Sequence, residues 1–250
     1  MKLGLIGAGN MASALARGIG EPVLVHDIDA AKAEALAAEL GGEALASGAE
    51  LAERADVVVL CHKPQQLAEV AEQISPRAIA SILAATTTGQ IEQAYPDTPV
   101  YRFIPNIPAE VRKGMLCYVP GRLAGEGPEE ELLELFGRAG TILRLDEEPL
   151  IEPAMALMSC GPAFMALIAE SFADAGAEHG IPGDDAMRMV VETMGGTAAY
   201  LAANGWDAEG LRTRVATPGG ATERGLIRLE EEGLARVCRA AVDAVVEGTR

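Results

Sequence analysis

A glycine-rich turn near the amino terminus has the spacing of a dinucleotide-phosphate site. Gly7, Gly9 and Ala12 fit the pattern G-x-G-x-x-[G/A], directly after an apolar run at 2–6 and at the start of a helical pattern at 11–19. The first glycine permits a tight turn, the second lets the backbone approach a pyrophosphate, and the small third residue lets helix and strand pack closely. The positive end of the helix then faces the phosphates. The turn predicts dinucleotide binding, and a purely structural strand–helix turn is the alternative.

An acidic residue follows the second expected strand. Asp27 comes after the residues 22–26 and lies 18 positions beyond Gly9, near the spacing expected for the residue that binds the adenosine ribose. A carboxylate there accepts both ribose hydroxyls and repels a 2′-phosphate, and no Arg or Lys occurs between Arg17 and Lys32. The charge pattern therefore favours NADH over NADPH as the cofactor. Asp27 also suits the N-cap of the next helix, and one Asp can serve both uses.

Two later strand ends carry polar side chains toward the same edge of a parallel sheet. His62 and Lys63 follow the β-branched run at 56–61. Lys63 suits either a phosphate or solvent, and His62 either a nicotinamide contact or an ordinary polar loop position. Asn106 lies between Pro105 and Pro108, whose rings make the loop rigid. We expect its amide to contact the nicotinamide side of the cofactor, to contact the substrate, or to form a turn.

The segment from Thr217 to Thr222 is the most informative part of the second half. Pro218, Gly219 and Gly220 precede a helical pattern, so the backbone N–H groups of this loop point toward one spot. The hydroxyls of the two threonines add directed hydrogen bonds. This arrangement predicts a carboxylate-binding site. A simple helix cap is the alternative, but a cap does not need two adjacent glycines.

The chain changes character near residue 149. Up to there, expected strands alternate with helices, which is typical of a mostly parallel sheet covered by helices. The expected strands are 2–6, 22–26, 56–61, 78–84, 100–103, 115–119 and 141–145, and the expected helices are 11–19, 30–40 and 64–74. Beyond that point only helices are expected, at 151–180, 184–203, 207–215, 218–231 and 233–247. The prediction is an α/β protein with a Rossmann-type dinucleotide-binding domain at 1–148 and an all-α domain at 149–250.

Composition and charge exclude several classes of protein. The 250 residues include 20 Lys and Arg against 37 Asp and Glu, a net charge of −17, which disfavours partners such as nucleic acids or anionic membranes. The uncharged stretch 153–169 is short for a membrane span and is broken by Gly161-Pro162, so we expect a buried helix. Four separate cysteines suggest neither a metal site nor disulfides. We therefore expect a cytoplasmic protein, and the half-apolar helices predict a homodimer.

Six segments follow one another in a recognisable order. They are residues 6–12, Lys63-Pro64-Gln65, Pro105-Asn106-x-Pro108, Gly161-Pro162-Ala163, Asp174-Ala175-Gly176 and Pro218-Gly219-Gly220-Ala221-Thr222. In this order the chain resembles pyrroline-5-carboxylate reductases over nearly its whole length, and the last segment is the most specific. The resemblance implies NAD(P)H-dependent reduction of 1-pyrroline-5-carboxylate to L-proline, the last step of proline synthesis. It also implies a helical dimerisation domain, with dimers often assembled into larger rings.

The motifs and the resemblance together assign site residues. The predicted substrate site, for the carboxylate and the ring nitrogen, consists of Thr217, Gly219, Gly220, Ala221 and Thr222, with Thr222 as the catalytic residue that relays a proton. The predicted cofactor site consists of Gly7, Ala8, Gly9, Asn10, Met11, Asp27, His62, Lys63, Pro64 and Asn106. A protonated cyclic imine is already a strong electrophile, so hydride transfer depends on positioning and electrostatics. No catalytic triad and no metal are expected.

Four residues depart from the family pattern, several of them near the expected pocket. Ile107 replaces the usual Thr, Cys160 the usual Ser and Phe164 the usual Tyr, and residues 84–86 read Ala-Ala-Thr where Ala-Ala-Gly is usual. These changes leave two alternatives open, a reductase of another cyclic imino acid and a non-catalytic dinucleotide-binding sensor of the same fold.

Two other enzyme classes fit the sequence less well. A 3-hydroxyacid dehydrogenase relies on a Lys in its helical domain, whereas the last lysine here is Lys113. A ketol-acid reductoisomerase needs metal ligands, for which Glu170, Asp174 and Glu178 have helical spacing. We interpret these three carboxylates as a solvated helix face.

Overall fold

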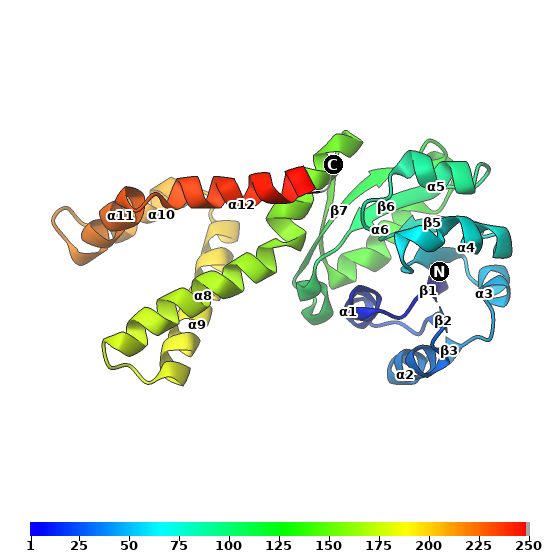
Figure 1. Ribbon diagram of the computed structural model, residues 1–250, viewed down its shortest axis with the longest axis horizontal. Coiled ribbons are helices and arrows are strands. Elements are labelled where there is room, and N and C mark those ends of the chain that lie inside the picture. The colour runs from blue at the N-terminus through cyan, green and yellow to red at the C-terminus, as the bar shows by residue number, and fades with distance from the viewer. Residues whose placement is uncertain (249–250) are drawn as a thin grey trace. The chain divides into compact units, whose positions relative to one another are not determined.

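The computed structural model describes residues 1–248, which divide into two compact units, Met1–Pro162 and Ala163–Gly248. The first unit combines one sheet with helices, and the second consists of helices and turns (Figure 1). This confirms the predicted fold class, a Rossmann-type domain followed by an all-α domain. The boundary expected between residues 148 and 149 remains a prediction about domains, since compactness alone divides the chain after Pro162.

The first unit is built on an eight-stranded sheet in the order β3-β2-β1-β4-β5-β6-β7-β8. Neighbouring strands are parallel except β6 and β7, which are antiparallel. The strands are β1 Leu3–Ile6, β2 Leu24–His26, β3 Glu43–Ala44, β4 Val57–Leu60, β5 Ile79–Ser81, β6 Val100–Ile104, β7 Gly114–Pro120 and β8 Gly140–Arg144. The antiparallel pair arises because the connection at 105–113 is too short for a crossover between parallel strands.

Helices cover both faces of this sheet (Figure 1). In β4, Val57 and Val59 pack with α1, α2 and α6, whereas Val58 and Leu60 pack with α3, α4 and α5. The helices are α1 Asn10–Ile19, α2 Ala30–Leu40, α3 Gly48–Arg54, α4 Leu67–Gln73, α5 Thr88–Ala94 and α6 Glu129–Phe136. A strand buried on both faces needs apolar residues at successive positions, which explains the continuous run in β4.

The strand expected at 78–84 is shorter than predicted. β5 ends at Ser81, and Ala85 has a φ of +50°, in the left-handed region that favours glycine. The apolar residues after Ser81 therefore belong to a turn that leads into α5. Apolar composition extended the predicted strand too far, because a turn buried beneath neighbouring elements also carries apolar side chains.

The chain leaves the sheet through α7 Ile151–Ala154 and a π-helical turn at Met155–Ser159. The second unit follows with α8 Gly161–Glu178, α9 Gly183–Ala203, α10 Ala208–Val215, α11 Ala221–Glu231 and α12 Leu234–Gly248. Among residues 163–248, the buried positions are Ala169, Ala173 and Ala186. These helices therefore do not enclose a core of their own within one chain.

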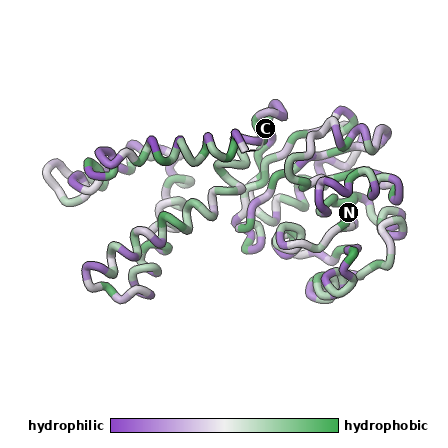
Figure 2. Tube along the Cα trace, in the orientation of Figure 1, coloured by the Kyte–Doolittle hydropathy of each residue, from purple (hydrophilic) through white to green (hydrophobic). Residues whose placement is uncertain are grey.

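The apolar stretch 153–169 is covered only in part: Met155 and Met158 pack against a buried cluster that contains Ile104 and Val119. Leu157, Met165 and Leu167 are all exposed, and hydrophobic colour continues along much of α8 in Figure 2. The prediction of a buried helix is therefore wrong for the exposed part of this stretch in the single chain. Among residues 1–248, the helical stretch Glu148–Glu178 is long and apolar enough to cross a membrane by length and composition. Apolar surface of this extent requires a covering partner.

Candidate functional site

The turn between β1 and α1 has the backbone that a phosphate site requires. Gly7 has a φ of +107°, and a Cβ there would lie 2.8 Å from the carbonyl carbon and oxygen of Cys61. A Cβ at Gly9, by contrast, would meet nothing within 4 Å. The protein's own packing thus requires Gly7, whereas Gly9 leaves room for a ligand at the amino terminus of α1. Asn10 is exposed at the first position of α1, Met11 is half-buried beside it, and Ala12 packs in the core.

Asp27 holds this turn from the end of β2. Its Oδ2 accepts the N–H of Ala8 at 2.7 Å, and its Oδ1 accepts the N–H of Asp29 at 2.8 Å. Each oxygen keeps a further lone pair that a ribose hydroxyl can use. The N-cap of α2 is Asp29, so the alternative role expected for Asp27 as a helix cap is wrong.

One cleft of about 510 Å³ lies at the carboxyl ends of β1, β2 and β4. Five residues of the predicted cofactor site line it together, namely Gly7, Gly9, Asp27, His62 and Lys63. The cleft is the expected place for a ligand in an open parallel sheet, outside the strand ends. The structure thus unites residues that are more than 50 positions apart in the sequence.

Sequence reasoning missed several residues that line the same cleft. Ile28 is 89% exposed beside it, and Val70 and Ile74 add apolar surface from α4 and the residue that follows it. Lys32 also lines the cleft, with its Nζ 3.5 Å from the Asp29 carboxylate. The available signal was the position of Ile28, directly after Asp27. An apolar wall next to a ribose-binding carboxylate suits a flat aromatic base.

His62 contributes an acceptor that has no partner. Its Nδ1 lies 2.9 Å from the carbonyl oxygen of Lys63, and because a carbonyl only accepts, Nδ1 carries the hydrogen. Burial lowers the pKa of His62, although the bond to Lys63 opposes this shift, so the ring is neutral and Nε2 is an acceptor. Among residues 1–248, this Nε2 is buried without a hydrogen-bond partner. An unsatisfied acceptor at the cleft fits a cofactor rich in hydroxyl groups.

Lys63 and Pro64 stand at the start of a short 3-10 helix, Pro64–Gln66. The Lys63 N–H donates to the side chain of Gln66 at 3.1 Å, and the Lys63 side chain is exposed. Pro64 lines a separate open hollow that it shares with Ala85 and Gln90. The Lys63-Pro64 pair therefore has Lys63 in the cleft and Pro64 beside it.

Asn106 is placed apart from the cleft. It is 7% exposed, its Nδ2 donates to the carbonyl of Met158 at 2.8 Å, and its Oδ1 accepts the N–H of Met115 at 2.9 Å. The amide thus joins the end of β6 to β7 and to the π-helical turn. Its contact with a cofactor remains a prediction, because Asn106 is absent from the lining of the cleft.

A buried ion pair that sequence reasoning missed lies nearby. The Arg102 side chain is 2% exposed, and its Nη1 donates to Glu148 Oε1 at 2.6 Å. The same oxygen accepts the N–H of Thr88 at 2.5 Å and its hydroxyl at 2.8 Å. Burial opposes ionisation, but these hydrogen bonds hold the pKa of Glu148 below its usual value. The signal was an Arg inside the apolar strand Val100–Ile104, which needs a carboxylate partner.

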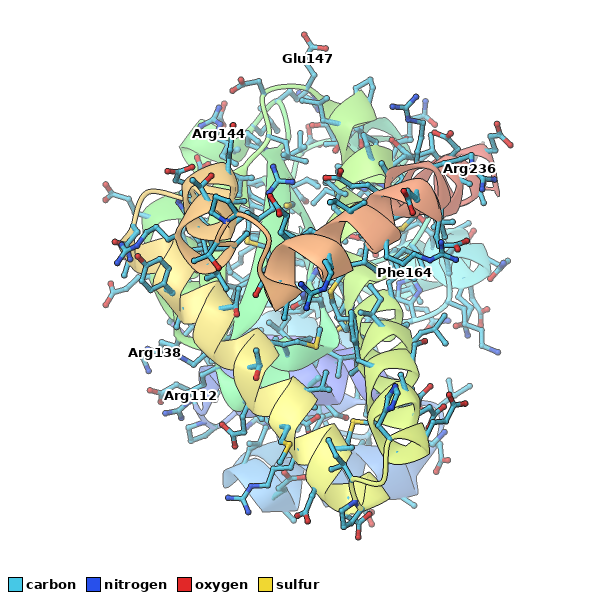
Figure 3. The ribbon with its side chains drawn as sticks, turned by 90° about the vertical axis from the view of Figure 1, so that its left-hand side faces the viewer. Arg112, Arg138, Arg144, Glu147, Phe164 and Arg236 are labelled. Carbon is cyan, nitrogen blue, oxygen red and sulfur yellow. The ribbon has the colours of Figure 1, made fainter. Side chains whose placement is uncertain are left out.

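The residues that depart from the family pattern occupy different environments. Ile107 is 50% exposed at the start of the 3-10 helix Ile107–Val111, which follows β6. Cys160 is half-buried directly after the π-helical turn, and Phe164 is half-buried near the start of α8 (Figure 3). Single π-helical turns occur frequently at functional sites.

The Thr217–Thr222 segment forms a tight turn before α11. Gly220 N–H donates to the Thr217 carbonyl at 2.8 Å, and Gly219 has a φ of +70°. Gly219 N–H donates to Glu223 Oε2 at 2.6 Å. The two glycine donors are therefore used within the chain. Among residues 1–248, the N–H groups of 221–223 have no acceptor, and no side chain caps the helix. The backbone N–H groups that this segment offers to a ligand are therefore those in the first turn of α11. The exposed hydroxyls of Thr217 and Thr222 lie beside them.

The possible metal ligands on α8 are dispersed. Glu170, Asp174 and Glu178 are all exposed. Across residues 1–248, no group of three or more His, Cys, Asp or Glu side chains is arranged to hold a metal ion.

Comparison with known proteins identifies both parts of the chain. Residues 148–250 match the family described as pyrroline-5-carboxylate reductase dimerisation, and residues 2–86 match NADP oxidoreductase, coenzyme F420-dependent. The pyrroline-5-carboxylate reductase of Pseudomonas aeruginosa is 30% identical over 255 residues, which cover 97% of this chain and 93% of that protein. The matches therefore extend over both predicted domains.

Solved structures agree with these matches. A 1-pyrroline-5-carboxylate reductase from Streptococcus pyogenes superimposes with a TM-score of 0.89 at 25% identity, covering 100% of this chain and 98% of that one. A Plasmodium falciparum pyrroline carboxylate reductase with NADP bound gives a TM-score of 0.88 at 26% identity, covering 100% and 97%. Together with the cleft and the turn before α11, these similarities show that the chain belongs to the pyrroline-5-carboxylate reductase family of NAD(P)H-dependent oxidoreductases.

Proposed function

We propose that the chain reduces 1-pyrroline-5-carboxylate to L-proline, the last step of proline synthesis. The similarity to a pyrroline-5-carboxylate reductase over 97% of the chain carries this proposal. The cleft at the β1–α1 turn and the uncapped first turn of α11 support it, because one suits a dinucleotide and the other a carboxylate.

The cofactor is assigned to the first unit. A bound NAD(P)H supplies the hydride that adds to the imine carbon, while the electron pair of the C=N bond moves to the ring nitrogen. Gly7, Ala8 and Gly9 give the turn its shape, and we assign Asn10, Met11 and Lys63 to the cofactor phosphates because Asn10 and Met11 begin α1 and Lys63 lines the cleft. Asp27 accepts the ribose hydroxyls, and His62 accepts a further hydrogen bond. Pro64 and Asn106 complete the predicted set of cofactor residues.

The substrate is assigned to the turn before α11. The free N–H groups of Ala221 and Thr222 bind the substrate carboxylate, together with the Thr217 hydroxyl. Gly219 and Gly220 form the turn that presents these donors. The Thr222 hydroxyl accepts a hydrogen bond from the protonated ring nitrogen, and it relays a proton to this nitrogen once hydride transfer has returned the electron pair to it. The protein thus acts by positioning and by electrostatics.

NADH is the preferred cofactor in this proposal. Two carboxylates, Asp27 and Asp29, stand at the end of β2 where a 2′-phosphate would bind. Lys32 lies in the same cleft, but its charge is already compensated by Asp29 at 3.5 Å. The P. falciparum relative has NADP bound, so the preference for NADH in this chain rests on this local charge alone.

The active form is a homodimer, or a larger ring of dimers, in the cytoplasm. The second unit leaves large apolar side chains exposed, among them Met165, Leu167, Phe172 and Val237. A second copy of the same helices would cover them. The net charge of −17 makes nucleic acids and anionic membrane surfaces unsuitable partners.

A reductase of another cyclic imino acid is the second candidate. Ile107, Cys160 and Phe164 differ from the family pattern, and they are less polar than the residues that they replace. A larger or more apolar imine would suit such a pocket. A non-catalytic dinucleotide sensor is disfavoured, because a sensor has no use for the uncapped turn before α11.

Replacement of Thr222 tests the proposed chemistry. Thr222→Ala should lower kcat/KM for 1-pyrroline-5-carboxylate at least about tenfold, since it removes one hydrogen bond to the reacting ring. Thr222→Ser keeps the hydroxyl and should retain most of the activity. Thr213→Ala is the matched control, because the Thr213 hydroxyl donates to the backbone carbonyl of Glu209 within α10 and lies outside the proposed site. Unchanged turnover of every imine tested with Thr222→Ala would overturn the role of this residue.

A further inference from the structure

Two neighbouring side chains hold both backbone polar groups of Gly219, its N–H and its carbonyl. Glu223 Oε2 accepts the Gly219 N–H at 2.6 Å, and Arg224 Nη1 donates to the Gly219 carbonyl at 2.8 Å. Both side chains come from the first turn of α11, which follows directly. The residue that they hold has a left-handed φ of +70°, so its peptide needs fixing against alternative conformations.

This arrangement resembles half of a capping box that is displaced by one residue. In the complete motif, a Ser or Thr at the N-cap accepts the N–H of the third helical residue, and a Glu at that third position accepts the N–H of the N-cap residue. Here Gly220 is the N-cap and has no side chain, and Glu223 at the third position accepts the N–H of Gly219, one residue before the N-cap. A Cβ at Gly220 would lie 2.5 Å from Thr217 Oγ1, so the tight turn excludes a capping side chain. Glu223 therefore fixes the turn while the first N–H groups of α11 stay available.

We propose that Glu223 and Arg224 are positioning residues for the substrate carboxylate. The inference rests on the proposed substrate site and explains how a loop of two glycines keeps one shape. By fixing the two peptide units on either side of Gly219, the pair holds the N–H groups of Ala221 and Thr222 in the direction of an incoming carboxylate. Donors that already have their bound orientation bind a ligand more tightly, because the loop loses less conformational entropy when the ligand binds.

The two functions of Glu223 are separable by substitution. Its oxygen is needed as an acceptor for Gly219 N–H, whereas its negative charge opposes an anionic substrate nearby. Gln keeps an acceptor of the same reach without the charge, and Ala removes both. If Glu223 acts as an acceptor, Glu223→Gln should keep the KM of wild type. If Glu223 acts through its charge, Glu223→Gln should raise KM as Glu223→Ala does.

The experiment measures KM and kcat for 1-pyrroline-5-carboxylate in Glu223→Ala, Glu223→Gln and Arg224→Ala, with the full-length protein in its native assembly. Glu231→Ala is the matched control, because Glu231 lies on the same helix and pairs with Arg228 at 3.5 Å in solvent. We expect Glu223→Ala to raise KM about tenfold with kcat within about twofold of wild type. Glu223→Gln should keep KM within about twofold of wild type or lower it. Arg224→Ala should raise KM in the same direction as Glu223→Ala.

Other outcomes would overturn the inference. An unchanged KM in Glu223→Ala would do so, as would a KM in Glu223→Gln as high as in Glu223→Ala. Thermal unfolding and size-exclusion chromatography of the same variants show whether each one is folded and assembled. If Glu223→Ala is not folded, the KM of Glu223→Gln decides whether the inference holds. Failure of the proposed substrate site itself would appear separately, as a Thr222→Ala variant with wild-type KM and kcat.

Discussion

Glu148 supplies the charge that neutralises the buried guanidinium of Arg102, so its removal should destabilise the first unit. Arg102 is 2% exposed and Glu148 28% exposed, and one Glu148 oxygen accepts three hydrogen bonds. Breaking a buried pair by deleting one partner costs about 3–5 kcal/mol. Because Glu148 is partly solvated, we expect about 3 kcal/mol for Glu148→Ala. At this chain length, that loss lowers the midpoint of thermal unfolding by roughly 6–12 °C.

The assay is thermal and urea unfolding followed by circular dichroism, with Glu147→Ala as the matched control. Glu147 is the adjacent carboxylate and extends into solvent (Figure 3). Glu148→Gln retains an acceptor for Thr88 but not the charge, so it should lower the free energy of unfolding by about half as much as Glu148→Ala. A midpoint for Glu148→Ala within about 1 °C of the Glu147→Ala control would refute the assignment of a stabilising buried pair.

The same pair predicts how stability depends on pH. The pKa of Glu148 is lower in the folded protein than in the unfolded chain, so its contribution is fully present above the ordinary Glu pKa of about 4.3. The contribution disappears as the pH falls through the lowered folded-state value. The difference in free energy of unfolding between wild type and Glu148→Gln should therefore be constant near neutral pH and shrink in acid. A difference that grew in acid would contradict this sign.

Three further predictions concern the cleft and the loops around it. Asp27→Ala removes the acceptor for Ala8 N–H and for the ribose, so calorimetry should show the Kd for NADH rising about tenfold and the Kd for NADPH rising less; an equal rise for both would argue against a ribose contact. Ala85→Gly relieves a left-handed φ of +50° and should raise the free energy of unfolding by roughly 0.5–1 kcal/mol in urea titrations, whereas a loss would mean that the turn is not strained. Asn106→Ala breaks two hydrogen bonds of a buried amide and should lower that free energy by about 2 kcal/mol, and a neutral effect would show that the amide does not brace β6 against β7.

The fold was largely predictable because its central strands are apolar on both faces. The run at Val57–Leu60 and the glycine turn after β1 require a buried parallel sheet with a crossover helix. Four elements were not predicted, namely β3, α3, α5 and α6. β3 has two residues, and α3 and α5 have seven each, so hydrophobic periodicity had little length over which to appear. The acidic first turn of α6, at Glu129–Glu131, masks its apolar side.

The candidate site was predictable where a short sequence motif determines the local backbone conformation, as in the glycine-rich turn. Gly7, Gly9 and Asp27 line one cleft because strand order places their loops together. Asn106 shows the limit, since its bonding partners Met115 and Met158 are unremarkable in sequence. The occupied N–H groups of Gly219 and Gly220 show the same limit, because only three-dimensional geometry reveals which donors the chain already uses.

The most direct test of the account is reduction of 1-pyrroline-5-carboxylate by the purified protein, with NADH and NADPH oxidation measured side by side. We predict turnover with both cofactors and a higher kcat/KM with NADH, because two carboxylates, Asp27 and Asp29, line the proposed cofactor cleft and would repel a 2′-phosphate. Proline should form in a one-to-one ratio with the oxidised cofactor. Tight binding of either cofactor without any proline formation would contradict the proposed reductase.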